Sequence, residues 1–172
     1  MLATHRSAEE RYEVLREKAR QLAQTTLPIP LLGAVTLKGI DLKTLVTAES
    51  WEGRRVNWPW KDGYSTYSFR NPKRFELAIW HRHILCGLSM GRPTWTGDKL
   101  RLDFIEALPI KNPLKGRTVE VVLSAAEAYA DQIGAHQIRI MNPINDQVKA
   151  FYTSSKVGYA YDSRSDCCWR DL

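Results

Sequence analysis

The sequence of 172 residues lacks any apolar run approaching the roughly 20 residues that span a bilayer. Residues 1–15 also lack the apolar core of a signal peptide. We therefore expect a cytoplasmic protein without membrane contact. No internal repeat and no low-complexity segment divides the chain, so solenoid and fibrous classes are excluded.

Cysteine and histidine are scarce. The three cysteines, Cys86, Cys167 and Cys168, are odd in number and two are adjacent, which is a poor basis for disulfide pairing. The four histidines add no regular ligand spacing. We expect no metal site.

What is present is an ordinary globular composition, with 44% hydrophobic and 26% charged residues. The length fits a single domain over residues 1–172. The net charge is +6 and the isoelectric point about 9.3. This balance permits an anionic partner, but it does not separate a nucleic acid from a polyphosphate cofactor.

The first third of the chain contains two predicted helices. Ser7 to Gln24 repeats apolar residues at helical spacing, and Ser7 with Glu10 reads as a capping box. This helix packs on its own domain or supports a homodimer. Leu31 to Leu37 suggests a strand or extended lead-in, and Asp41 caps a short helix that ends at Glu49.

The segment Trp51 to Asn71 interleaves aromatic and basic side chains. Gly53, Pro59 and Gly63 argue against a long regular element there. Two readings stay open: the aromatic rings close a core over an irregular segment, or they contact a ligand by stacking.

The remaining chain alternates strand and helix patterns. A hairpin and a third strand form an antiparallel meander, and a helix followed by a returning strand completes a βαβ unit. Gly87 suggests a bulge or a close backbone approach. The expected elements are strands over Arg74–His81, Ile84–Met90, Lys99–Leu108 and His136–Met141, helices over Thr118–Ile133 and Asn145–Ser154, and closing strands over Gly158–Asp162 and Cys167–Leu172.

The loop from Asn112 to Arg117 opens directly into the long helix. A helix N-terminus offers unpaired N–H groups and about half a positive charge. Gly116 lets an anion approach the backbone, while Lys115 and Arg117 add full charges. The loop fits a pyrophosphate, although a solvent-facing turn with basic residues is also compatible with it.

Taken in order, these motifs resemble the GNAT superfamily of acyl-CoA-dependent N-acyltransferases. Gly116 matches the first glycine of the family's Q/R-x-x-G-x-G/A loop. Asn145 and Tyr152 match the ends of its N-x-x-A-x-x-x-Y segment, and Gly158-Tyr159 matches the pair that follows. Three departures are visible: Pro113 replaces the loop's Gln or Arg, Thr118 replaces its second small residue, and the spacing from Tyr152 to Gly158 is about two residues longer than usual.

The resemblance implies a mixed α/β (α+β) GNAT-like fold, an antiparallel meander plus one βαβ unit in a mixed central sheet, with an extra N-terminal helix. Residues 1–73 would form the helical, substrate-facing part and residues 74–162 the acyl-CoA-binding core. The implied reaction is direct transfer of an acetyl or other acyl group from acyl-CoA to an amine. The acceptor would be a small molecule, a peptide or protein, or an aminoacyl-tRNA.

The resemblance also implies site residues. Tyr152 would protonate the leaving thiolate. Asp103 and Glu106 are candidates for the base, but their odd spacing on one strand puts them on opposite faces unless a bulge intervenes. The cofactor-binding candidates are Ala107, Leu108, Leu114, Lys115, Gly116, Arg117, Thr118, Val119 and Asn145.

Two other functions remain compatible with the sequence. One is a GNAT fold that has lost catalysis and serves as a binding module. The other is a basic nucleic-acid-binding protein that uses the Trp51 to Arg70 segment, although no recognised nucleic-acid motif is present.

Overall fold

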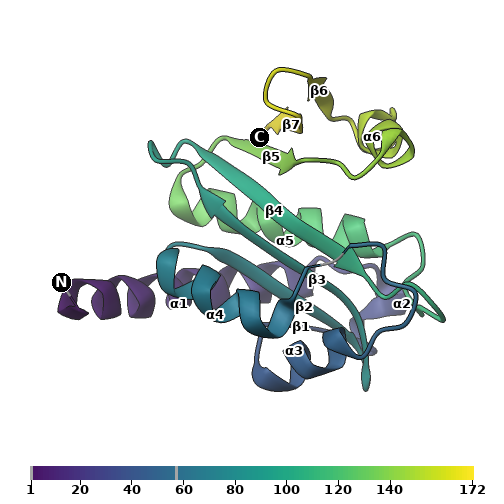
Figure 1. The fold of residues 1–172 in the computed structure, drawn as a ribbon, viewed down its shortest axis with the longest axis horizontal. Helices are drawn as coiled ribbons and strands as arrows, with labels where there is room; N and C mark the ends of the chain where they lie inside the picture. The colour runs from purple at the N-terminus through teal and green to yellow at the C-terminus, as the bar shows by residue number, and fades with distance from the viewer. Residues whose placement is uncertain (1, 57) are drawn as a thin grey trace.

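The computed structural model of the chain describes residues 2–56 and 58–172 (Figure 1). Met1 and Asn57 lie outside this description. The helices are α1 (Leu2–Thr25), α2 (Ile29–Leu32), α3 (Leu42–Glu49), α4 (Trp60–Arg70), α5 (Thr118–Ile133) and α6 (Asp146–Thr153). The strands are β1 (Val35–Lys38), β2 (Phe75–His81), β3 (Ile84–Pro93), β4 (Lys99–Ala107), β5 (Gln137–Met141), β6 (Ala160–Asp162) and β7 (Cys167–Asp171).

The strands of the described residues form one sheet in the order β1-β2-β3-β4-β5-β7-β6. Strands β4 and β5 pair in parallel and every other pair is antiparallel. Helix α5 connects the parallel pair, which makes the predicted βαβ unit. The expected mixed sheet with an antiparallel meander and an N-terminal helix is therefore confirmed.

Helices cover both faces of the sheet (Figure 1). On one face, which we call the apolar face, α1 and α5 pack on a large aliphatic core that includes Leu77, Leu100, Val122 and Ile138. On the other, which we call the aromatic face, α3 and α4 pack over Trp60, Trp80, Leu88 and Met90. Trp58 stacks on Phe104 there, with ring centroids 4.0 Å apart.

The aromatic segment therefore closes a core, and the structure decides between the two readings of Trp51 to Asn71. The prediction that this segment is irregular was only half right: residues 51–56 and 58–59 form no helix or strand, but Trp60–Arg70 is helical. Gly63 lies inside α4, where a Cβ would come within 2.6 Å of the Trp58 ring. Here glycine makes room for a large ring instead of breaking the helix.

Helix α1 also differs from its prediction. It begins before Ser7, so Ser7 and Glu10 are interior positions and do not form a capping box. Early residues of the helix are held by tertiary contact, since the His5 ring stacks on Phe69 of α4 at 4.8 Å. The expected apolar stripe packs on the chain's own α5 and β1, although Leu22 is exposed.

Local capping signals were predicted correctly in three places. Asp41 caps α3 by accepting the Thr44 N–H, and Asn145 caps α6 by accepting the Val148 N–H. Gly134 ends α5 in the left-handed conformation, with φ at 75°. The stretch Leu31 to Leu37 was only half right, since α2 occupies its beginning and β1 its end.

In residues 2–56 and 58–172, no helix is long and apolar enough to cross a membrane. The three cysteines are buried and free.

Candidate functional site

The two parallel strands of the βαβ unit separate partway along their length. Their pairing runs from Lys99 opposite Gln137 to Leu102 opposite Ile140. From there to Ala107, β4 is paired with β3 but no longer with β5. On its other edge, β5 stays paired with β7 to its last residue, Met141, which lies opposite Cys167. The second half of β4 thus has an edge with no strand of the described residues paired to it.

Two bulges bend the strands at this point. Between β2 and β3, Ile79 lies opposite Gly87 and Trp80 opposite Leu85, so Cys86 is the extra residue. The second bulge leaves Asp103 as the extra residue of β4, between Leu102 opposite Gly91 and Phe104 opposite Met90.

The β4 bulge changes which side chains share a face. Leu102 belongs to the apolar core, whereas Asp103 accepts a hydrogen bond from Tyr67 of α4 and Phe104 packs on the aromatic core. Glu106 also faces the aromatic core, because Trp60 donates to it. Asp103 and Glu106 therefore lie on the same face. From the sequence we expected opposite faces unless a bulge intervened, and the bulge is present.

The loop before α5 is anchored by Asn112. Its amide nitrogen donates to the main-chain oxygens of Cys86 (3.1 Å) and Leu108 (3.2 Å), and its oxygen accepts the N–H of Leu114 at 2.8 Å. Asn112 thus ties the loop to the β3 bulge and the end of β4. Pro113, which follows it, has no side-chain donor to contribute.

Gly116 adopts φ at +80°, and a Cβ placed on it would meet no atom within 4 Å. The first N–H groups of a helix have no intrahelical acceptor. At α5, Arg117 provides no side-chain cap, and the N–H of Val121 is the first to bond back, to Arg117 O. This end of the helix therefore presents open backbone donors beside Lys115 and Arg117.

Thr118 does not crowd this opening, although its size departs from the family pattern. Its side chain is buried, and its hydroxyl donates to Leu114 O at 3.3 Å. Its methyl group occupies the space beside Gly87, where a Cβ would lie only 2.3 Å away. Thr118 and Gly87 fit each other, so the predicted close approach at Gly87 is confirmed and the extra bulk points inward.

A cavity of about 370 Å³ lies between the loop and the unpaired part of β4. It is lined by Ala107, Leu108, Pro109, Lys111, Asn112, Lys115, Gly116, Thr118, Val119 and Phe151. Most of the sequence-predicted cofactor residues are therefore gathered around one opening. Leu114, Arg117 and Asn145 are outside this lining: Leu114 is buried beneath the loop, Arg117 is exposed at the start of α5, and Asn145 caps α6.

Four lining residues were missed. Pro109, Lys111 and Asn112 belong to the same loop and could have been included by position. The fourth, Phe151, precedes Tyr152 on α6 and is 40% exposed. At the end of β4, the Leu108 N–H already donates to Cys86 O, so this donor is not free for a ligand. By strand alternation, the main-chain groups of Ala107 face the open edge.

Both candidate carboxylates are engaged. Arg54 holds Glu106 through two hydrogen bonds, of 2.7 and 3.0 Å, and Trp60 adds a third from its indole N–H. Asp103 accepts from Tyr67 at 2.8 Å and pairs with Arg92 and Arg101 at 3.1 and 3.2 Å.

Of the two, Asp103 lies where β4 and β5 separate, directly after Leu102. Glu106 points under α4 and its side chain is only 7% exposed.

Tyr152 lies on α6 and is 5% exposed. Burial, with a smaller contribution from Cys168, raises the pKa of its phenol well above the ordinary value, so the group stays protonated at neutral pH. It does not line the cavity, whereas its neighbour Phe151 does.

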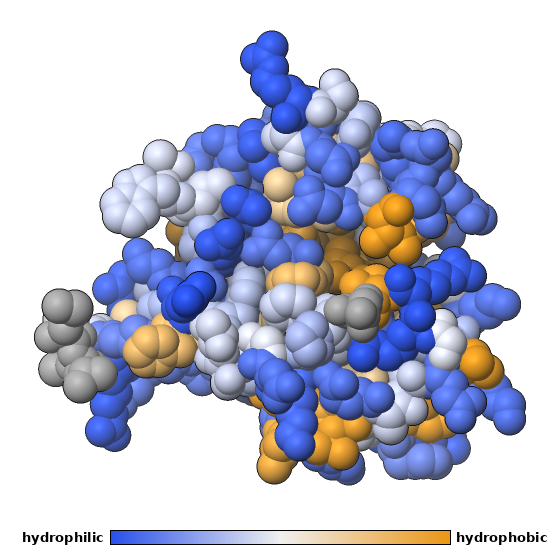
Figure 2. Space-filling view, in the orientation of Figure 1, coloured by the Kyte–Doolittle hydropathy of each residue, from blue (hydrophilic) through white to orange (hydrophobic). Residues whose placement is uncertain are grey.

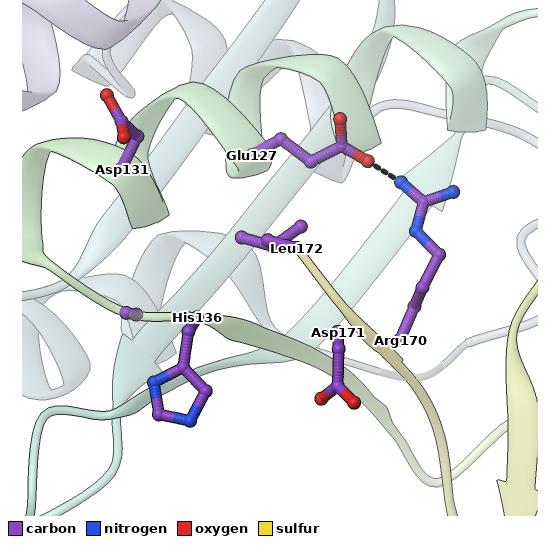
Figure 3. Close-up of a pocket in the computed structure, with 7 residues that line it drawn as sticks. Glu127, Asp131, His136, Arg170, Asp171 and Leu172 are labelled. Atoms are coloured by element: carbon purple, nitrogen blue, oxygen red, sulfur yellow. Dashed lines mark hydrogen bonds and ion pairs between the residues drawn. The ribbon is translucent and has the colours of Figure 1, made fainter.

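A second cavity, of about 600 Å³, lies at the opposite end of α5 (Figure 3). Glu127 and Arg170 form an ion pair on one side of it, and the side chains of His136 and Asp171 point away from that pair. It is remote from the loop and shares no lining residue with the first cavity.

No protein-family model matches the chain, and no curated protein matches its sequence. Solved structures do match in fold. One is Ard1 from Thermoplasma volcanium, at 14% identity and a TM-score of 0.61, covering 81% of this chain and 98% of that one.

A second match is a variant of the spermidine N-acetyltransferase SpeG from Vibrio cholerae, at 12% identity and a TM-score of 0.60, covering 81% and 94%. A third is Naa50 from Arabidopsis thaliana in complex with a bisubstrate analogue containing CoA, at 15% identity and a TM-score of 0.56, covering 81% and 98%. The chain therefore has the fold of the GNAT superfamily of N-acetyltransferases.

Proposed function

We propose that this protein is an acyl-CoA-dependent N-acetyltransferase. The observation that carries the proposal is the separation of β4 from β5 beside a cavity whose rim is the N-terminus of α5. The fold shared with N-acetyltransferases supports the same reading. An unpaired strand edge suits an extended ligand arm, and an open helix N-terminus suits a pyrophosphate.

The chain's own groups divide the binding of the acyl-CoA substrate between them. Backbone N–H groups of Gly116, Thr118 and Val119 would hold the pyrophosphate, with Lys115 and Arg117 supplying charge; the Arg117 N–H already donates to Leu114 O. Main-chain groups of Ala107 would pair with the pantetheine arm. Asn112 fixes the shape of this cradle, because it bonds the loop to both neighbouring strands.

Transfer requires the acceptor nitrogen to attack the thioester carbonyl, forming a C–N bond as the C–S bond breaks. The amine proton must leave and the thiolate must gain one. We assign proton removal to Asp103, directly or through a water, because it lies where the strands part. We assign the proton donor to Tyr152, which matches the family's tyrosine and follows Phe151 of the cavity lining.

Ligand binding can be tested by thermal unfolding with acetyl-CoA and with CoA. At 100 times the dissociation constant, a ligand stabilises the protein by about 2.7 kcal/mol. Lys115→Glu should remove most of the shift. Lys18→Glu, which makes the same charge change at an exposed position on α1, should leave it intact. Absence of a shift with any acyl-CoA would overturn the proposal.

The acid role has a matched control. Tyr152→Phe should lower kcat for acetyl transfer by about 10²-fold while the acetyl-CoA shift persists. Tyr159→Phe removes a hydroxyl that is also buried, has no hydrogen-bond partner and has a pKa raised by burial, and it should change turnover little. Equal effects of the two variants would remove Tyr152 from this role.

A further inference from the structure

Three arginines stand side by side across the sheet, close to where β4 and β5 separate. Arg92 of β3 lies opposite Arg101 of β4, and Arg101 lies opposite Arg139 of β5. Trp169 of β7 continues the line, opposite Arg139. We call these four residues the arginine row. Adjacent strands are about 4.8 Å apart, so the three arginines leave the sheet at even intervals over about 10 Å.

The row faces away from α5. Leu102 and Ile140 pack in the apolar core, so Arg101 and Arg139, one residue earlier on their strands, project from the opposite face. Figure 1 shows α5 behind this part of the sheet, with α4 lying over β2 and β3 and no helix in front of β5. The row therefore lies on the open part of the aromatic face.

The cations of the row exceed the carboxylates that contact them. Arg92 and Arg101 share one carboxylate, Asp103, and the Nε atom of Arg101 is buried without a partner. Arg139 donates to the side-chain oxygen of Gln137, whose amide in turn donates to Asp171 of β7. Among the described residues, the three guanidinium groups therefore have one carboxylate in direct contact, Asp103.

Two further carboxylates lie near the row, Asp171 of β7 and Asp162 of β6. Asp171 accepts from the Gln137 amide at 2.8 Å, and Asp162 accepts from the Ser165 hydroxyl at 2.5 Å and from the Arg164 N–H at 3.0 Å. Their negative charges reduce the positive potential around Arg139. Among the described residues neither forms an ion pair with the row, so Arg139 keeps guanidinium donors for another anion.

Further basic and aromatic side chains lie near the arginine row. Tyr67, which donates to Asp103, lies one turn before the exposed Arg70 at the end of α4. Trp169 is partly exposed and offers an indole face at the end of the row. Figure 2 shows this side of the molecule hollowed between its upper and lower parts, with strongly hydrophilic groups beside the hollow and apolar ones within it.

We propose that the arginine row binds the phosphodiester backbone of a single-stranded nucleic acid, and that this nucleic acid carries the acceptor amine. The proposal rests on the proposed function, because it names the acceptor of the same site. Guanidinium groups repeated at even spacing match a repeated anion better than a single one, and an indole beside them can stack a base. The row's position beside the strand separation would place the strand at the acceptor side of the thioester.

Binding can be measured by the anisotropy of a fluorescein-labelled 20-nucleotide single-stranded RNA of mixed sequence, between 50 and 200 mM KCl, without any CoA. We expect Arg139→Gln to weaken binding about tenfold. It should also lower the slope of log K against log[KCl] by about 0.7, the value of one lost phosphate contact. Lys18→Gln, an equal charge change on α1, should alter neither quantity.

The acceptor is then tested with total cellular RNA and radiolabelled acetyl-CoA. Acid-precipitable label should be removed by ribonuclease and should fall about tenfold in Arg139→Gln but not in Lys18→Gln. The acetyl-CoA thermal shift should be the same in both variants, which separates this inference from the proposed function.

Three results would overturn the inference while the acetyl-CoA shift stands. The first would be no binding of RNA, the second equal binding of RNA by Arg139→Gln and Lys18→Gln, and the third an acetyl label that is entirely resistant to ribonuclease. A duplex of the same sequence that binds as tightly as the single strand would also contradict it. A thermal shift with inorganic pyrophosphate that Arg139→Gln abolishes, without RNA binding, would assign the row to a small phosphorylated acceptor instead.

Discussion

The two faces of the sheet are covered by different chemistry. On the apolar face, α5 and α1 cover aliphatic side chains such as Leu100 and Val122, and the buried Arg16 of α1 bonds to main-chain oxygens just before β2. On the aromatic face, α3 and α4 bury indole and phenol rings whose polar atoms bond to carboxylates of the sheet, as Trp60 does to Glu106 and Tyr67 to Asp103.

The difference has a functional meaning. An aliphatic core holds the sheet without directing any single group, whereas hydrogen bonds between rings and carboxylates fix particular side chains in place. Burial and the charge of Asp103 raise the pKa of Tyr67, so its hydroxyl remains a donor to that carboxylate. The aromatic face can therefore position Asp103 while leaving the neighbouring half of the sheet open.

The largest loss of stability is expected from removing Trp60 of the aromatic face, which is fully buried. Trp60→Ala should destabilise the protein by about 4 kcal/mol, since it deletes a large ring and removes the indole donor of Glu106, which keeps its two hydrogen bonds from Arg54. Leu100→Ala on the apolar face should cost about 3 kcal/mol. Chemical denaturation measures both, and Trp60→Phe isolates the indole N–H. A fully stable Trp60→Phe would show that the ring alone matters.

The buried ion pair provides the second test. Glu106→Leu leaves Arg54 facing an apolar side chain and should cost about 3 kcal/mol of unfolding free energy. Arg54→Met combined with Glu106→Leu should recover most of that loss. The exposed pair of Arg92 with Asp103 is the control, and Arg92→Met should cost at most about 1 kcal/mol. No recovery in the double variant would mean that Glu106 acts through Trp60 alone.

The contact between Gly87 of β3 and Thr118 of α5 can be tested by adding a methyl group at one position and removing it at the other. Gly87→Ala should cost about 2 kcal/mol because its Cβ would collide with Thr118. Thr118→Ser removes the colliding methyl, so the double variant should be more stable than Gly87→Ala. The double variant should also keep the acetyl-CoA thermal shift. Additive losses in thermal unfolding would show that the two positions do not share this space.

The smallest expected effect concerns the cap of α3 on the aromatic face. Hydrogen bonds from Thr44 lower the pKa of Asp41. Because the folded pKa lies below the unfolded one, the cap's stabilisation is complete above about pH 4 and is lost as pH falls through the folded pKa.

Asp41→Ala should therefore cost about 1 kcal/mol at pH 7 and less at pH 2. Asp41→Asn, which still caps, should change stability little at pH 7. Unfolding free energies at the two pH values check this, and a pH-independent cost of Asp41→Ala would contradict the assignment.

Much of the fold could be predicted from short-range signals. The apolar spacing of Thr118 to Ile133 predicted α5, Asn145 predicted the start of α6, and Gly116 marked the loop that rims the cavity. Each of these features is encoded within one or two helical turns. The prediction failed where packing decides, as at Gly63, which lies in α4 with the Trp58 ring against it while that ring stacks on Phe104 of β4.

The candidate site shows the same division. The sequence named the loop and the residues of β4, but their grouping around one cavity depends on where β4 leaves β5. The bulge at Asp103, which brings it to the same face as Glu106, depends on pairing with β3. Phe151 was missed because its exposure follows from the packing of α6.

By itself, therefore, the sequence determined the order of strands and helices from Arg74 onward, the capped ends of α3, α5 and α6, and the position of a basic, glycine-containing loop before α5. These follow from periodicity, capping and backbone freedom, which act between neighbours in the chain. Only the tertiary structure decided the separation of the parallel strands, the pairing of each carboxylate and the alignment of Arg92, Arg101 and Arg139. Strand register joins residues distant in sequence, and local patterns do not fix it.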